Sequence, residues 1–242
     1  MDMTKEKLVV LTGAGVSAES GIQTFRGVGG MWDDHKVTEV ASPEGWQNNP
    51  QVVCDFYNHR IDEMSQAEPN EAHHILAELE EVYDVDIFTQ NVDGLHEAAG
   101  STSVHHLHGS IAEKRSVIDG SVVPFENGER FGPEGDGTYL YRPNIVWFGE
   151  MPMHLKLAES AISAADKLVV VGTSLKVFPA AALPLYAPEA AKKIFVDPNA
   201  TPVAAKHTDV LIRSRLRTVK FDTLVDEVAT VGLRQLVDSN IL

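Results

Sequence analysis

The stretch KLVVLTGAGVSAESGIQTFRG, residues 7–27, runs from an apolar segment directly into a glycine-containing turn. A short run rich in Val, without alternating polar residues, is typical of a strand that is covered on both faces. Gly13 and Gly15 allow a tight turn and a close backbone approach to a phosphate, in front of a helix N-terminus. A left-handed turn without any ligand is the alternative. The stretch therefore predicts a buried strand that carries a candidate phosphate site at its carboxyl end.

Similar runs alternate with helical patterns over most of the chain. Further apolar runs occupy residues 85–90, 167–173, 193–198 and 209–214. Apolar residues at three- and four-residue steps predict helices over 70–82, 153–165 and 221–231. This alternation predicts an α/β fold with a doubly wound, Rossmann-like parallel sheet. The carboxyl ends of its strands would meet at one rim, where such sheets bind their ligands.

Two stretches interrupt the alternation and predict a smaller inserted module. Residues 28–66 contain a glycine-rich loop and a predicted helix, whereas residues 110–141 are rich in glycine and poor in large apolar side chains. We expect one domain over 1–242, whose large part is built from about 1–27, 67–109 and 142–242. The two interruptions would meet as the small module.

The composition is that of an ordinary globular protein, with 43% hydrophobic and 23% charged residues among 242. The formal net charge of −15 argues against nucleic-acid binding. No apolar run approaches the length of a membrane span, and the first seven residues are too short and polar for a signal peptide. The single cysteine, Cys54, excludes an intramolecular disulfide and favours a reducing, cytoplasmic location. The sequence gives no indication of the oligomeric state.

The second apolar run ends in TQNVDGLH, residues 89–96, and this ending argues against a dehydrogenase. A dinucleotide-binding dehydrogenase usually has a third glycine in its first turn, and Ala18 stands at that position. Such enzymes also place a carboxylate after the second strand to hold a ribose, and none closes this strand.

Several long motifs occur together, in one order, and resemble those of a single family. They are GAGVSAESGIQTFRG (13–27), TQNVDGLH (89–96), HLHGS (106–110), RPNIVWFGE (142–150) and VVGTSL (170–175). In this order and approximate spacing the chain resembles the sirtuins, the NAD-dependent protein-lysine deacylases. The resemblance extends from Leu8 to about Asn199.

The resemblance implies a reaction that consumes NAD. The bond between nicotinamide and ribose breaks while the acyl-lysine oxygen attacks the ribose carbon. The products are nicotinamide, O-acyl-ADP-ribose and free lysine. By match to the family's His-Gly motif, His108 is the general base, a role suited to the pKa of imidazole. His105 and His106 are competing candidates, and a metal cluster across the three or a buried structural histidine are the alternatives.

The resemblance also implies a set of cofactor-binding residues. Asn91 and Asp93 would orient the ribose and the nicotinamide amide, with catalytic roles, although simple turn chemistry is their alternative. Phe25 would shield the reacting ribose, and Arg26 would add charge near the phosphates. The other positions expected at NAD are Gly13, Ala14, Gly15, Ser17, Gln90, Val92, Gly172, Thr173, Ser174, Asp197, Pro198 and Asn199.

Residues 56–60, FYNHR, resemble the variant found in the sirtuin branch that removes acidic acyl groups such as succinyl. Tyr57 and Arg60 lie three apart on one face of a predicted helix and together can bind a carboxylate. The alternative is a surface arginine that pairs with Glu63. The acylated peptide itself is expected to pair as an added strand along Val146, Trp147, Phe148, Gly149 and Glu150, with core packing as the alternative for Val146 and Phe148.

The chain departs from most sirtuins in the insertion that follows the catalytic histidine, where four cysteines usually hold a structural zinc. Residues 110–141 contain neither cysteine nor histidine. Because zinc sites built from carboxylates alone are unusual, we predict that this chain binds no structural zinc.

The sequence thus predicts an NAD-dependent protein-lysine deacylase that acts on succinyl-lysine and also on acetyl- or malonyl-lysine. Its expected partners are acylated lysine side chains of proteins. Two alternatives stay open: a sirtuin-like protein ADP-ribosyltransferase, and a sensor that binds NAD or ADP-ribose without turnover.

Overall fold

A computed structural model of the chain describes residues 5–24, 37–126, 128–206, 210–212, 215–217 and 219–242. Two of the predicted cofactor residues, Phe25 and Arg26, lie outside the described residues. Within those ranges no helix is both long and apolar enough to cross a membrane.

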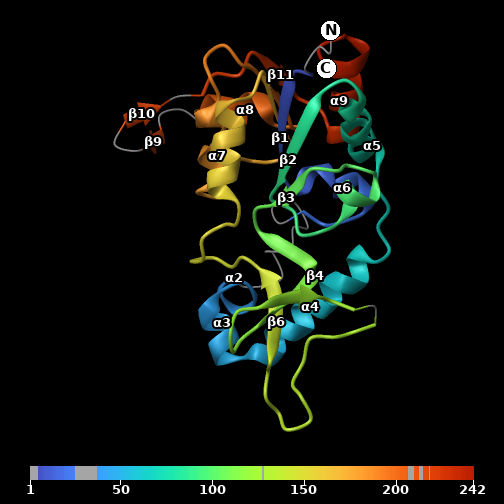
Figure 1. The fold of residues 1–242 in the computed structure, drawn as a ribbon, viewed down its shortest axis with the longest axis vertical. Helices are drawn as coiled ribbons and strands as arrows, with labels where there is room; N and C mark the ends of the chain where they lie inside the picture. The colour runs from blue at the N-terminus through green and yellow to red at the C-terminus, as the bar shows by residue number, and fades with distance from the viewer. Residues whose placement is uncertain (1–4, 25–36, 127, 207–209, 213–214, 218) are drawn as a thin grey trace.

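The main sheet contains six parallel strands in the order β11-β8-β7-β1-β2-β3 (Figure 1). Their bounds are β1 Lys7–Thr12, β2 Asp84–Thr89, β3 Val104–His106, β7 Lys167–Val171, β8 Lys192–Val196 and β11 Thr223–Val225. The central strand β1 pairs with both β2 and β7. The prediction of an α/β fold with a parallel sheet is therefore confirmed.

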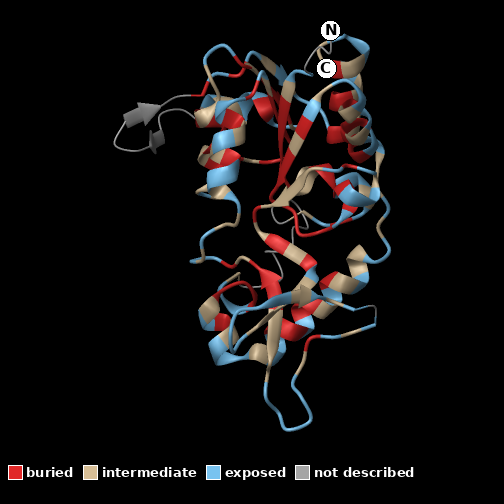
Figure 2. Cartoon of the chain, in the orientation of Figure 1, coloured by how far each residue is buried: buried red, intermediate tan, exposed pale blue. Residues whose placement is uncertain are grey.

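Both faces of the main sheet are buried, as the apolar runs predict (Figure 2). Leu8 and Val10 pack in one core cluster with residues of α5 (Glu71–Glu78) and α9 (Ala229–Asp238). Val9 and Leu11 pack in another with residues of α7 (Leu155–Ser163) and of the 3-10 helix η4 (Ala180–Tyr186). Because side chains alternate along a strand, a continuous apolar run serves both cores.

The C-terminal part differs from the sequence prediction. The predicted helix over 221–231 is wrong: Thr223–Val225 forms the edge strand β11, and α9 begins only at Ala229. The predicted strand over 209–214 is only partly realised, because β9 (Val210–Ile212) pairs antiparallel with β10 (Arg215–Arg217) in a separate ribbon. Hydrogen bonds to β8 explain the first error: the Asp222 amide donates to the Lys193 carbonyl, and the Lys193 amide donates to the Asp222 carboxylate, both at 2.8 Å.

A second, antiparallel sheet lies at the other end of the molecule, with strand order β5-β4-β6 (Figure 1). It consists of β4 (Gly109–Ser116), β5 (Val122–Pro124) and β6 (Tyr141–Ile145), and it packs with α2 (Val37–Val40), α3 (Pro43–Asn48) and α4 (Pro50–Met64) around its own apolar cluster. We call these elements the small module; its boundaries stay a prediction.

The remaining described elements are short. They are the 3-10 helices η1 (Ala14–Val16), η2 (Ala18–Ser20) and η3 (Leu79–Glu81), and the helices α6 (Leu95–Ala98) and α8 (Ala200–Lys206).

Candidate active site

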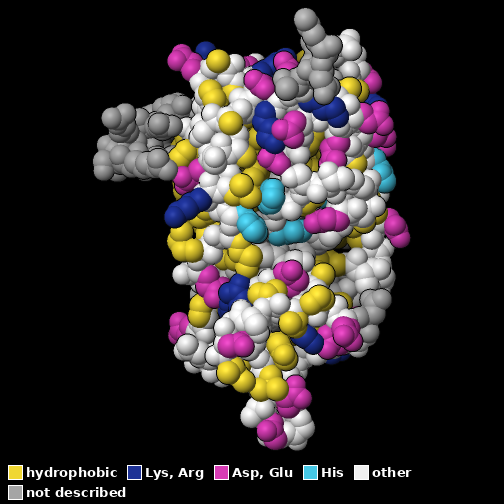
Figure 3. Space-filling model, viewed as in Figure 1, with side chains coloured by type: hydrophobic (Ala, Val, Ile, Leu, Met, Phe, Trp, Pro, Cys, Tyr) yellow, Lys and Arg dark blue, Asp and Glu magenta, His cyan; other side chains and the backbone are white. Residues whose placement is uncertain are grey.

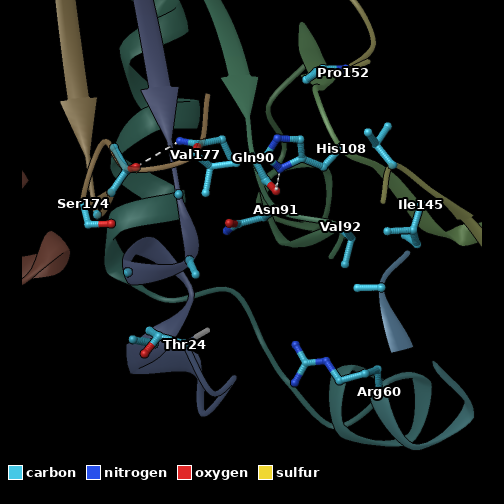
Figure 4. A pocket seen from close by; sticks show the side chains of 18 of the residues that line it. Thr24, Arg60, Gln90, Asn91, Val92, His108, Ile145, Pro152, Ser174 and Val177 are labelled. Atoms are coloured by element: carbon cyan, nitrogen blue, oxygen red, sulfur yellow. Dashed lines mark hydrogen bonds between the residues drawn. The ribbon is translucent and has the colours of Figure 1, made fainter. Parts of the chain in front are cut away.

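A cavity of about 480 Å³ lies between the carboxyl ends of the main-sheet strands and the small module (Figure 4). The turns after β1, β2, β7 and β8 line one side of it, and residues of α4 and of the segment after β6 line the other. Most of the predicted site residues meet here: Gly13, Ala14, Gly15, Tyr57, Arg60, Gln90, Asn91, Val92, His108, Val146, Trp147, Phe148, Gly149, Gly172, Thr173, Ser174, Asp197, Pro198 and Asn199.

The turns after β1 and β7 pack backbone against backbone. The amide of Gly13 donates to the Val171 carbonyl at 3.0 Å, and the amide of Gly15 donates to the Gly172 carbonyl at 2.8 Å. Gly172 has a φ of +61°, and a Cβ added there would lie 2.4 Å from the nitrogen of Val16. The glycines are thus required by the contact between the two turns, and the Gly15 amide is already used within the protein.

Asn91 is held by a buried network behind the cavity wall. Its side-chain amide donates to the Ser17 hydroxyl at 3.0 Å, and that hydroxyl donates to the Asp93 carboxylate at 3.1 Å. Burial raises the pKa of Asp93, although bonds from the Leu95 amide and from Ser17 oppose the shift. Only Asn91 lines the cavity, so Ser17 and Asp93 do not face it and instead hold Asn91 in place.

Two buried histidines lie behind this network, and the sequence analysis missed them. The amide of Asn70 donates to His73 Nδ1 at 3.2 Å, so Nε2 carries the hydrogen and points toward Ser17 Oγ at 3.5 Å. Burial lowers the pKa of His73 to about 4 and that of His96, whose ring centroid lies 4.9 Å away, to about 3. Both rings are therefore neutral at pH 7. The available signal was Asn70 three residues before His73, at a helix start.

His108 is the histidine that faces the cavity. Its Nδ1 lies 2.9 Å from the carbonyl oxygen of Gln90, and since a carbonyl only accepts, Nδ1 carries the hydrogen (Figure 4). Nε2 is then left with its lone pair. Burial lowers the pKa of His108, against the opposing effect of the bond to Gln90. The ring is thus a neutral proton acceptor at pH 7.

The two neighbouring histidines have other partners and do not line the cavity. His106 bonds through Nδ1 to the Asn91 carbonyl and through Nε2 to Glu97, both at 2.8 Å. Burial alone would lower the pKa of His106, but these two bonds raise it. His105 stacks on Phe88 at 4.8 Å between ring centroids.

A few histidine side chains are grouped on the surface midway along the molecule (Figure 3). Among the described residues, no group of three or more His, Cys, Asp or Glu side chains is arranged to hold a metal ion. His105, His106 and His108 lie within the described residues and do not form such a group.

Tyr57 and Arg60 lie at the opposite side of the cavity from the strand ends. The Trp147 indole donates to the Tyr57 hydroxyl at 3.0 Å, and burial raises the pKa of Tyr57, so the phenol keeps its proton. Arg60 is only 4% exposed, and its Nη1 donates to Glu63 at 2.8 Å. The pairing with Glu63 that the sequence offered as an alternative is present, but the arginine is buried and points into the cavity (Figure 4).

The segment after β6 has most of its amides occupied. The amides of residues 146, 147 and 148 donate, in that order, to the His108 carbonyl, the Glu150 carboxylate and the Ala41 carbonyl, at 2.8, 2.8 and 3.0 Å. An added peptide strand along this segment is therefore restricted to the remaining groups, which include the amide of Gly149.

The cavity also has lining residues to which the sequence assigned no role. Five of them lie inside the quoted motifs, but a motif alone does not show which of its side chains face a cavity: Ala18, Glu19, Thr24, Phe56 and Ile145. The others come from parts of the chain without a motif: Ala41, Ile111, Pro152, Val177, Phe178, Val228 and Ala229. Glu150, at the end of the expected peptide-pairing segment, lines the cavity as well.

Known proteins resemble this chain in sequence. The chain matches the model of the Sir2 family over residues 13–179. It is 48% identical over 196 residues to the NAD-dependent protein deacylase of Helicobacter pylori, covering 81% of this chain and 84% of that protein.

Solved structures extend the likeness over nearly the whole chain. A complex of a Sir2 homologue with NAD has a TM-score of 0.80 and 37% identity, covering 96% of this chain and 88% of that one. A complex of Sir2 with a p53 peptide and NAD+ has a TM-score of 0.78 and 30% identity, covering 98% and 94%. The motifs, the fold and these matches together place the chain in the Sir2 family.

Proposed function

We propose that this chain is an NAD-dependent protein deacylase that removes succinyl groups, and also acetyl or malonyl groups, from lysine side chains. The relatives named NAD-dependent protein deacylase support the general activity. The single observation that supports the acyl preference is a buried Arg60 that lines the cavity next to Tyr57.

The strand-end side of the cavity fits NAD. When bound, NAD supplies an activated ribose carbon whose bond to nicotinamide can break. The turns after β1 and β7 line this side with backbone at Gly13 and Gly172, and with side-chain hydroxyls at Thr173 and Ser174. Gln90 donates to Thr173 Oγ1 at 3.1 Å, which fixes that hydroxyl at the cavity wall (Figure 4). Asn91, held by Ser17, would meet the ribose and the nicotinamide amide.

His108 would act as general base. Its Nε2 keeps a lone pair that can accept a proton from a ribose hydroxyl, because the bond from Nδ1 to Gln90 fixes the tautomer. The lowered pKa keeps the ring unprotonated at neutral pH. Asp93 and Ser17 would contribute by orienting Asn91.

The far end of the cavity would receive the acyl group. Phe56, Val92, Ile111 and Ile145 line it with apolar surface, which suits the methylene groups of any short acyl chain. A succinyl carboxylate placed there needs charged or hydrogen-bonding partners. Arg60 would bind it through donors that Glu63 does not use, and Tyr57 would donate its hydroxyl hydrogen.

The test is Arg60→Met, assayed on succinyl- and acetyl-lysine peptides of identical sequence with NAD. We expect kcat/KM for desuccinylation to fall about 100-fold, since charge-assisted hydrogen bonds to the carboxylate are lost, and deacetylation to change only a few-fold. Arg130→Met is the matched control, because this exposed arginine pairs with Asp62 outside the cavity. An equal loss on both peptides would refute the role of Arg60.

Product analysis separates the deacylase from its alternatives. A deacylase releases nicotinamide and free lysine together. An ADP-ribosyltransferase would leave labelled ADP-ribose on protein, and a sensor would release no nicotinamide.

A further inference from the structure

One ion pair lies where the acyl carboxylate would bind. Arg60 and Glu63 are one helical turn apart on α4, with Nη1 2.8 Å from Oε2. The arginine side chain is 5% exposed and the glutamate side chain 30% exposed, so the pair is partly screened by solvent. Among the described residues, Glu63 provides the carboxylate that pairs with Arg60.

This pair balances the charge of a buried guanidinium. A buried cation without a counter-charge is costly, and Glu63 supplies that charge when the cavity holds no anion. The same carboxylate would stay close if a second anion bound the guanidinium nitrogens that Glu63 does not use. Two carboxylates on one arginine repel each other, and each weakens the attraction that the other experiences.

We propose that Glu63 is a specificity-determining residue that sets the balance between acidic and uncharged acyl groups. By neutralising Arg60 it lets acetyl-lysine enter without leaving an unpaired buried cation. By repelling a second carboxylate it weakens the binding of succinyl-lysine. The inference rests on the proposed role of Arg60 as the acyl-carboxylate reader.

The test is Glu63→Gln, which removes the charge and keeps an oxygen that accepts the bond from Arg60. We expect the ratio of kcat/KM for succinyl- over acetyl-peptide to rise about 3- to 10-fold. This is the effect expected from removing one partly screened charge a few ångströms from the bound carboxylate. The change should lie mainly in KM, because the charge acts on binding. Used as a competitive inhibitor of deacetylation, the succinyl-peptide should also bind more tightly to the variant.

Asp62→Asn is the matched control. It removes the same charge from the neighbouring position of α4, but Asp62 faces Arg130 at 2.5 Å and is half-exposed. The control should leave the ratio within about twofold of the starting protein. Thermal unfolding of both variants shows whether α4 is intact.

Each outcome decides the proposal. A raised ratio in Glu63→Gln with an unchanged ratio in Asp62→Asn supports it. An unchanged or lowered ratio in Glu63→Gln, or an equal rise in the control, overturns it. If Arg60→Met acts selectively on succinyl-peptide while Glu63→Gln changes nothing, only the inference on Glu63 fails. If Arg60→Met affects both peptides equally, the proposed acyl preference fails as well.

Discussion

At the scale of single residues, hydrogen-bond direction separates the candidate base from its neighbours. His106 uses both ring nitrogens within the protein, to the Asn91 carbonyl and to Glu97, whereas within the described part of the chain His108 bonds through Nδ1 alone. A ring that keeps one lone pair toward a cavity can accept a proton from a ligand. Of His105, His106 and His108, it is thus His108 that faces the cavity and keeps a ring nitrogen without a partner among the described residues.

We expect His108→Ala to lower deacylation about 10²- to 10⁴-fold, the usual contribution of a general base. His105→Ala is the control, because that ring stacks on Phe88 outside the cavity and should leave the rate within a few-fold. Full activity of His108→Ala would remove the basis of the proposed mechanism.

The assignment of His108 as the base also predicts how kcat/KM depends on pH. A base works in its unprotonated form, and burial lowers the pKa of His108 below the ordinary value of about 6.5. The acid limb of kcat/KM should therefore lie below pH 6.5, falling up to tenfold per pH unit, with a plateau from about pH 7 upward. A limb above pH 7 would contradict this assignment.

At the scale of elements, the site depends on two strand-end turns that touch. The Gly15 amide donates to the Gly172 carbonyl, and an added Cβ at Gly15 would lie 2.7 Å from the Cα of Gly172. The turns after β1 and β7 can approach this closely because both lack side chains at the contact. Helix α4, which carries Arg60, is held by side-chain hydrogen bonds instead. The Asn58 side chain donates to the carbonyl of Phe131 and accepts from its amide, both at 2.8 Å.

We expect Gly172→Ala to destabilise the protein by about 3 kcal/mol or more and to abolish NAD binding, because strain at positive φ adds to a backbone clash. Gly120→Ala is the matched control. Its φ is +75°, but no atom lies within 4 Å of the added Cβ, so the free energy of unfolding should fall by only about 1 kcal/mol. Urea unfolding and NAD titration measure both. An equal loss of unfolding free energy in the two variants would show that contact between the turns is unimportant.

At the scale of the whole molecule, the small module is held by packing and hydrogen bonds among the described residues. Its apolar cluster includes Phe131, Trp147 and Val53, with Phe125 stacked on Phe131 at 4.5 Å between ring centroids. The single cysteine, Cys54, is fully buried in that cluster, and burial raises the pKa of its thiol to about 12. A thiol in this state is a poor metal ligand.

We therefore expect purified protein to contain well under one zinc per chain, and a chelator to leave its unfolding temperature unchanged. Phe131→Ala, by contrast, should cost about 3–5 kcal/mol, the usual effect of truncating a buried aromatic ring. Metal analysis measures the zinc content, and thermal unfolding measures the effects of the chelator and of Phe131→Ala. One tightly held zinc per chain would contradict the prediction that packing replaces the metal.

The sequence determined the strands that are covered on both faces, since a continuous apolar run has no other stable place than a sheet interior. It also determined the residues at their carboxyl ends, because parallel strands bring those ends to one rim. Most candidate site residues therefore line the cavity. The motifs identified the family, and the match of residues 13–179 to the Sir2 family confirms it.

Only the tertiary structure decided what depends on distant partners. Thr223–Val225 has the spacing of a helix and is a strand because the edge of β8 is free to pair with it. Asp93 follows a strand end, yet lies behind Asn91 because Ser17 bridges the two. Arg60 and Glu63 have the spacing of an exposed helix pair, and only the packing of α4 within the small module buries the arginine at the cavity. Local patterns fix conformation and exposure on average, whereas burial and hydrogen-bond partners are set by residues far away in the chain.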